Sequence, residues 1–257
     1  MRVPMSGDIV PDSQVWLYDW FDIPCISPAA VRNAIAENPE GEDLVLEINS
    51  GGGSVFAGFE MYSVLRNAPC RTVAEVQSLA ASAASTMMLG CQEVTASPVA
   101  QVMIHRPSTA TDGDRDDHMA SVGVLDSIME SILNAYTIKC GTRATRDQLR
   151  DLMEQSTWMT ATQARDLGLV DKITGAEDID PSTVLNCAGV GAGIRALAAF
   201  PKPTYDSLLT EYHRLVAAGK APAEGRIPTP PAEEPDTTND SALELAKLRL
   251  RLEKIRI

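Results

Sequence analysis

The stretch SLAASAASTMMLGCQEV, residues 78–94, decides how the rest of the chain is interpreted. Its small residues predict a helix over 82–89 whose backbone can approach its neighbours closely. At the start of such a helix the hydroxyl of Ser82 stays reachable, and the amino end favours developing negative charge. Tight packing, with the serines bonded to backbone carbonyls, explains the same run. Ser85 lies one turn further on nearly the same face, so spacing does not choose between the two hydroxyls.

Upstream, INSGGGSVFAG (48–58) places three glycines after a strand predicted over 44–48. Glycine lets the backbone approach a bound group closely and present its N–H groups. A phosphate-binding loop is excluded, because no GK[ST] follows the glycines. The loop therefore fits a tight turn or a hydrogen-bond donor to an oxyanion.

Downstream, QVMIHRP (101–107) predicts a strand that ends at His105. A single histidine at the end of a strand is commonly a surface residue or a satisfied core residue. The two other histidines are His118, in a charged predicted helix, and His213, far towards the C-terminus. If the chain is a serine hydrolase, His105 is the only good candidate for its general base.

Working outward from these motifs, short β-like runs alternate with helical ones between residues 15 and 173, which is typical of an α/β domain. Strands are predicted over 15–18, 44–48, 72–76, 101–104 and 169–173. Helices are predicted after the Ser27-Pro28 start signal, around 59–65, and over 82–89, 116–139, 147–155 and 160–168. The helix over 116–139 is roughly 36 Å long at 1.5 Å per residue, a length that often reaches a neighbouring subunit.

Composition excludes several classes of protein. The net charge of −13 argues against a nucleic-acid surface. The five cysteines, an odd number without a CxxC pair, argue against a disulfide framework or a zinc site, and no other metal or cofactor motif is present. The N-terminus lacks the apolar run of a signal peptide, and the weakly polar stretch 79–91 is shorter than the ~18–20 residues that span a bilayer. We therefore expect a soluble, cytoplasmic protein (host cytoplasm if phage-encoded) that binds no membrane.

Together with TWMTATQARDLGLVDKI (157–173), the three motifs occur in an order that resembles the ClpP family of serine peptidases, especially its phage head-maturation (prohead protease) branch. The resemblance covers about residues 12–175. It implies a crotonase-like α/β core of ββα units, assembled into homo-oligomeric rings that cleave peptide bonds. It places the nucleophile on Ser82, the general base on His105, and the oxyanion donors on the N–H groups of Gly53 and Ala83. Gly51 stands where the family's loop usually has proline.

One position departs from the family pattern. The acidic member of the family's catalytic triad falls on Ser156, and a serine cannot supply the negative charge that stabilises an imidazolium. Glu154 and Asp151 lie two and five residues upstream, and Glu154 is the first candidate for the third member. The alternatives are a Ser–His dyad helped by water or backbone, and a slow or inactive enzyme.

The sequence divides into four segments. Residues 1–175 form the predicted peptidase domain and 176–220 a C-terminal extension. Residues 221–240 are rich in proline and acids with almost no large apolar side chain, which predicts a disordered linker. Residues 241–257 carry seven leucines or isoleucines among basic residues, which fits either an amphipathic helix that docks on a partner or a flexible terminus without a role.

These features lead to a serine endopeptidase that cleaves phage capsid or scaffold proteins during head maturation. One alternative is a degradative subunit of the ClpP type that is fed by an ATPase. Another, supported by Ser156, is a non-enzymatic oligomeric scaffold for assembly. A crotonase that binds coenzyme A would share the fold, but the serine–histidine constellation would then be a coincidence.

Overall fold

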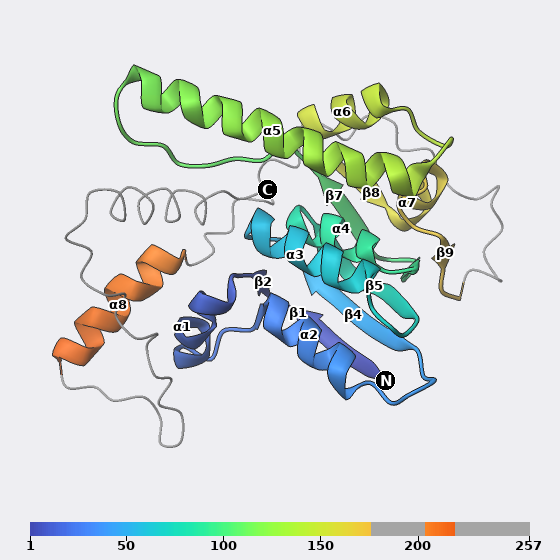
Figure 1. The fold of residues 1–257 in the computed structure, drawn as a ribbon, viewed down its shortest axis with the longest axis horizontal. Helices are drawn as coiled ribbons and strands as arrows, with labels where there is room; N and C mark the ends of the chain where they lie inside the picture. Colours follow the sequence, from blue (N-terminus) through green and yellow to red (C-terminus); the bar gives the residue numbers. More distant parts are fainter. Residues whose placement is uncertain (176–203, 219–257) are drawn as a thin grey trace.

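A computed structural model of the chain describes residues 1–175 and 204–218 (Figure 1). The main sheet runs in the order β1-β4-β5-β6-β9, with β7 joined to β5 and β8 joined to β7. Every pairing in it is parallel except that of β7 with β8. A parallel sheet needs crossover connections, and helices supply them here. The predicted α/β class is confirmed.

The strands of the main sheet are β1 (Arg2–Ser6), β4 (Leu44–Ser50), β5 (Thr72–Ala81), β6 (Glu93–Ala96), β7 (Gln101–Ile104), β8 (Thr157–Thr160) and β9 (Lys172–Ile173). A second, two-stranded parallel sheet consists of β2 (Asp8–Ile9) and β3 (Cys25–Ile26). The described α-helices are α1 (Val15–Trp20), α2 (Pro28–Glu37), α3 (Val55–Arg66), α4 (Ala83–Met87), α5 (Arg115–Cys140), α6 (Arg146–Glu154), α7 (Ala161–Leu167) and α8 (Tyr205–Ala217). Short 3-10 turns are η1 (Asp12–Gln14) and η2 (Met88–Gly90).

Most helices begin where the sequence carries a capping side chain. The hydroxyl of Ser27 accepts a hydrogen bond from the N–H of Ala30, and Pro28 occupies the first helical position of α2. Capping boxes open three further helices, at Asp114, Thr145 and Thr160. These signals explain why the predicted bounds of α5 and α6 agree with the observed ones to within one residue at each end. None of the described helices combines the length and apolar character needed to cross a bilayer.

One predicted strand is wrong, and another is shorter than predicted. Residues 15–18 form helix α1, in which the consecutive residues Leu17 and Tyr18 are both buried. Successive side chains of a strand point to opposite faces, so this one-sided burial suits a helix. The strand predicted over 169–173 is only β9, because the N–H groups of Leu169 and Val170 donate to the carbonyl of Ala164 and extend the C-terminal cap of α7.

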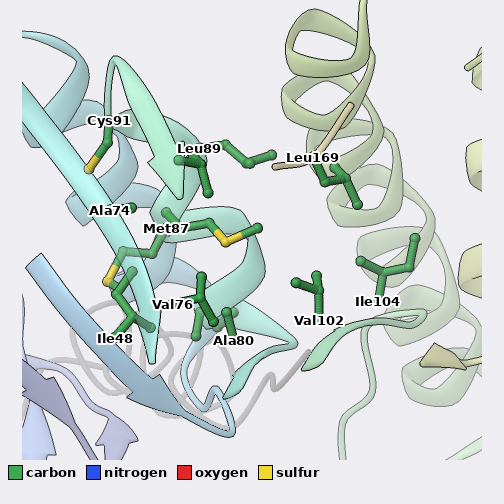
Figure 2. Close-up of a cluster of buried hydrophobic side chains, with 14 of the residues drawn as sticks. Ile48, Ala74, Val76, Ala80, Met87, Leu89, Cys91, Val102, Ile104 and Leu169 are labelled. Atoms are coloured by element: carbon green, nitrogen blue, oxygen red, sulfur yellow. The ribbon is translucent and has the colours of Figure 1, made fainter. Parts of the chain in front are cut away.

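The main core fills the space between the sheet and the helices that cover it. Figure 2 shows Ile48, Val76 and Ala80 from β4 and β5 beside Met87 of α4. All four are fully buried. Because α4 packs directly on these strands, the residue that links β5 to α4, Ser82, is held between two rigid elements.

A second apolar cluster joins the two ends of the described chain. Helix α8 lies beside α1, away from the main sheet (Figure 1). The ring of Tyr212 on α8 meets those of Trp16 and Trp20 edge-on, with centroid distances of 5.1 and 4.8 Å. Leu208 is buried against the same cluster. This helix lies in the predicted extension 176–220 and was not predicted; residues 221–257 lie outside the described residues.

Candidate active site

The pairing of β5 with β7 brings Ser82 and His105 together. These strands are parallel neighbours, and their last paired residues are Ala81 and Met103. The carboxyl ends of parallel strands meet at one edge of a sheet, so the residues that follow emerge side by side. The N–H of Ser82 donates to the carbonyl of Met103, at 2.9 Å. The Oγ atom of Ser82 then lies 2.9 Å from Nε2 of His105.

Ser82 adopts a backbone conformation that is rare for a residue with a side chain. Its φ is 60° and its ψ is −127°. The sequence analysis had placed Ser82 inside the helix, but the residue stands just before α4. Such a conformation costs about 1–3 kcal/mol and persists where the surroundings impose it. The side chain is turned towards His105 as a result. Strained turns between a strand and a helix are used in hydrolases to present a nucleophilic serine.

The neighbouring Ser85 has a different environment. It is fully buried, and its Oγ atom donates to the carbonyl of Ser82 at 2.6 Å and lies 2.7 Å from the hydroxyl oxygen of Tyr136. Of the two serines that spacing could not separate, only Ser82 contacts His105. His118 instead lies 2.8 Å from the hydroxyl of Thr111.

The Gly-rich loop lies against the start of α4. A Cβ atom on Gly52 would stand 2.6 Å from Cβ of Ser82 and 2.9 Å from the nitrogen of Ala83, so only glycine fits there. Ile9 fixes the loop from the other side, because its N–H donates to Gly52 and its carbonyl accepts from Ser54. Since neighbouring N–H groups of an extended chain point to opposite sides, the N–H of Gly53 faces away from Ile9.

Ser50 completes the support of this loop. Its hydroxyl is buried, donates to the carbonyl of Gly7 at 2.7 Å, and accepts from the N–H of Gly52 at 3.1 Å. The N–H of Ala83, at the first position of α4, precedes the hydrogen-bonded turns of the helix and has no intrahelical acceptor. The N–H groups of Gly53 and Ala83 stay the candidate oxyanion donors, and Gly52, next to Gly53, lies against Ser82 and Ala83. The sequence analysis missed both supports of the loop. Ile9 is distant from the glycines in the sequence, and Ser50 looks like an ordinary strand residue.

The sequence named Glu154, two residues before Ser156, as the first candidate for the third catalytic residue. Strand β8 pairs with β7 in a register whose last pair is Ile104 and Thr157, so His105 and Ser156 are the residues next to that pair. Glu154 is the last residue of α6, is exposed, and interacts electrostatically with Arg150. Ser156 has a φ of 53°, which marks the tight turn between α6 and β8. The third catalytic residue stays a prediction.

Residues 1–175 and 204–218 contain no cluster of side chains that could bind a metal ion. No three histidine, cysteine, aspartate or glutamate side chains in these ranges lie close enough to hold an ion. The carboxylate of Asp171 is committed elsewhere: it accepts from the N–H of Val94 at 2.7 Å and forms an ion pair of 2.5 Å with Lys139. It thereby joins β6 to α5, which agrees with a structural role.

Comparison with known proteins adds the family. A family model described as Clp protease matches residues 33–177, more than half of the chain. The matched range contains Ser82, His105 and the Gly-rich loop. It does not contain α1 or α8, so the aromatic cluster lies outside the part that the family model describes.

Curated relatives match over about half of the chain. The ATP-dependent Clp protease proteolytic subunit 2 of Corynebacterium glutamicum is 32% identical over 140 residues, which cover 54% of this chain and 68% of the relative. Subunit 1 of Chlamydia abortus is 33% identical over 143 residues, 53% of this chain and 71% of the relative. The proteolytic subunit of Porphyromonas gingivalis is 31% identical over 138 residues, 52% of this chain and 60% of the relative.

Proposed function

This chain belongs to the Clp protease family and is a serine-type peptidase, and we propose that Ser82 is its nucleophile and His105 its general base. The observation that carries the proposal is the contact of 2.9 Å between Ser82 Oγ and His105 Nε2. A nucleophile and its base need this distance for proton transfer. Membership of a peptidase family also disfavours the non-enzymatic scaffold.

The proposed reaction passes through an acyl-enzyme. Ser82 Oγ attacks the carbonyl carbon of the scissile peptide bond while Nε2 of His105 takes the hydroxyl proton. The N–H groups of Gly53 and Ala83 donate to the oxyanion that forms. When the C–N bond breaks, His105 returns the proton to the leaving amine. Water then attacks the acyl-enzyme in the same way, with His105 taking its proton and returning it to Ser82 Oγ, and the acyl group is released.

Two backbone donors fit this role better than side chains would. Both are fixed before substrate arrives: Gly53 by the bonds of Ile9 to its neighbours, and Ala83 by its place between β5 and α4. Preorganised donors stabilise the charge without reorganisation during the reaction, and the loss of one donor typically costs about 10²–10³ in kcat. The positive φ of Ser82, a strained backbone angle, is part of the same arrangement.

For the substrate, we propose phage capsid or scaffold proteins that are cut during head maturation, in the host cytoplasm. The resemblance of residues 78–94 to the head-maturation branch and the C-terminal extension beyond the family match support this role. The names of the relatives, ATP-dependent proteolytic subunits, support the second candidate, a degradative subunit that works with an ATPase. Cleavage of folded protein that depends on an added ATPase would favour this second role.

We further propose a homo-oligomeric ring. The N-terminal half of α5 extends beyond the sheet (Figure 1), and its side chains Met119 and Val122 are 59% and 49% exposed. A second copy of the chain would cover these apolar residues. Light scattering should give a multimer, which Val122→Glu should shift to smaller species. A monomer at micromolar concentration would contradict the ring.

The catalytic proposal is tested with purified full-length variants and a fluorogenic peptide. Ser82→Ala and His105→Ala should each lower kcat by at least about 10⁴-fold, since either residue alone disables a serine–histidine pair. Melting temperature and oligomeric state should not change. Retention of activity in Ser82→Ala would overturn the assignment of the nucleophile.

A further inference from the structure

A chain of buried hydroxyl groups ends on the backbone of Ser82. Tyr136 projects from α5 into the core and is fully buried. Its hydroxyl oxygen lies 2.7 Å from Oγ of Ser85 and 3.4 Å from Oγ1 of Thr86, and both of these residues belong to α4. Ser85 in turn contacts the carbonyl of Ser82 at 2.6 Å. Three hydroxyls on two helices therefore form a chain whose last member, Ser85, contacts the peptide group.

The direction of these hydrogen bonds follows from counting protons. A carbonyl only accepts, so the single hydroxyl proton of Ser85 goes to the carbonyl of Ser82. The contact between Tyr136 and Ser85 is then made by the proton of Tyr136, and Thr86 donates to Tyr136. Burial raises the pKa of Tyr136 above its ordinary value, so the phenol keeps this proton at neutral pH. The relay runs Thr86 to Tyr136 to Ser85 to Ser82.

The carbonyl of Ser82 and the N–H of Ala83 belong to the same peptide group. Each hydrogen bond accepted by the carbonyl draws electron density through the amide and makes its N–H a stronger donor. The carbonyl of Ser82 accepts twice, from the N–H of Ser85 at 2.9 Å and from its hydroxyl at 2.6 Å. In a buried chain each bond also polarises the next, which strengthens the whole series.

We propose that Ser85 and Tyr136 are positioning residues that act on catalysis through the peptide group of Ser82 and Ala83. They strengthen the N–H of Ala83 as an oxyanion donor and hold the positive φ of Ser82. The inference rests on the proposed function, because it needs Ser82 as nucleophile and Ala83 as donor. Neither hydroxyl touches the substrate, and Tyr136 acts only through Ser85.

The test uses Tyr136→Phe, Ser85→Ala and the double variant in the full-length chain. Each loses a hydroxyl and little volume. Since one hydrogen bond contributes a factor of about 2 to 13, Ser85→Ala should lower kcat about tenfold and Tyr136→Phe about threefold, both with KM unchanged. In the Ser85→Ala background, Tyr136→Phe should change kcat less than about twofold, because its only route to Ser82 is already removed.

A reversible peptide aldehyde provides a readout that a structural role would not move. Ser82 Oγ adds to the aldehyde carbon while Nε2 of His105 takes the hydroxyl proton, and the aldehyde oxygen then occupies the position of the oxyanion. The inhibition constant should weaken by the same factor as kcat/KM in each variant. Tyr62→Phe and Ser131→Ala are the matched controls: the first removes a tyrosine hydroxyl from α3, and the second removes a hydroxyl that donates to a backbone carbonyl on the exposed side of α5.

All assays are run at a temperature where every variant is folded by its melting curve. Lower melting temperatures with kcat and aldehyde affinity unchanged would overturn the proposal, as would additive effects in the double variant. Ser82→Ala separates this failure from that of the catalytic assignment. If Ser82→Ala is inactive while Ser85→Ala and Tyr136→Phe match the controls, the relay is wrong and the nucleophile stands.

Discussion

Ser85 donates its hydroxyl proton to the backbone carbonyl of Ser82, over 2.6 Å, and this contact sets apart two serines that look alike in the AASAAS run. The side chain of Ser82 is turned to His105, whereas that of Ser85 is turned into the core, to Tyr136. One helical turn separates the residues, yet the positive φ of Ser82 sends its hydroxyl out of the helical path. One serine is placed for chemistry and the other for support.

The close approach of Gly52 to Ser82 gives a first prediction. Gly52→Ala should lower kcat about 10²-fold or more, because its Cβ would stand 2.6 Å from Cβ of Ser82 and the loop that carries Gly53 must move. Its φ of 88° adds strain for any residue with a side chain. Gly41→Ala, whose Cβ meets nothing within 4 Å at a similar φ, is the control. Equal kcat values in the two variants would contradict the proposed oxyanion loop.

The third catalytic residue gives a second prediction. Glu154→Gln should change kcat less than about twofold, because Glu154 is exposed and interacts with Arg150. Ser156→Asp should raise kcat about tenfold, since residue 156 and His105 adjoin the last pair of the β7–β8 register and a carboxylate there would stabilise the imidazolium. Aspartate also tolerates the φ of 53°. A loss of ~10⁴ in Glu154→Gln would instead establish Glu154 as the triad acid.

The sequence predicted the elements whose ends carry local signals. The cap at Ser27 and the strand before His105 were predicted from local residues, and the structure shows capping boxes at Asp114 and Thr160, where two other predicted helices begin. The predictions failed where tertiary contacts decide. Residues 15–18 look like a strand in isolation, and they are helical where they meet Tyr212, almost two hundred positions away in the chain.

The candidate site divides in the same way. Ser82, His105 and the Gly-rich loop were predicted from the family resemblance, which rests on their residue types and their order in the sequence. The choice between Ser82 and Ser85 needed the backbone angles, which spacing does not contain. That Ser156 comes near His105 along the sheet could be seen only from the register of β7 with β8. Tyr136 gave no sequence signal, because a tyrosine in a long helix is usually a packing residue.

A third prediction concerns alkaline pH. Burial raises the pKa of Cys91 from 9.0 to about 12. Between these values the unfolded chain releases a proton that the folded chain keeps, so the free energy of unfolding should fall with rising pH, by up to about 1.4 kcal/mol per unit. Below pH 9 this contribution is fully present. Urea unfolding across the window should show a shallower pH dependence in Cys91→Ala, and an identical slope would contradict the buried thiol.

A fourth prediction compares two truncations. Removal of residues 221–257 retains α8 and should leave the melting temperature and small-peptide cleavage unchanged, while processing of the natural protein partner should drop if the end segment docks on it. Removal of residues 204–257 uncovers Trp16 and Trp20 and should lower stability by about 2–5 kcal/mol, the range for loss of large buried side chains. Equal melting temperatures of the two truncations would contradict the packing of α8 on α1.

The most direct test of the account is covalent labelling with a fluorophosphonate, followed by peptide mass mapping. A fluorophosphonate forms a stable phosphonyl ester with a serine hydroxyl that a neighbouring base activates, and fluoride leaves. The contact of Ser82 Oγ with Nε2 of His105 predicts a single adduct on Ser82, lost in Ser82→Ala and in His105→Ala and retained in Ser85→Ala. An adduct on Ser85, or a folded wild-type protein that stays unlabelled, would contradict the central claim that Ser82 is the nucleophile.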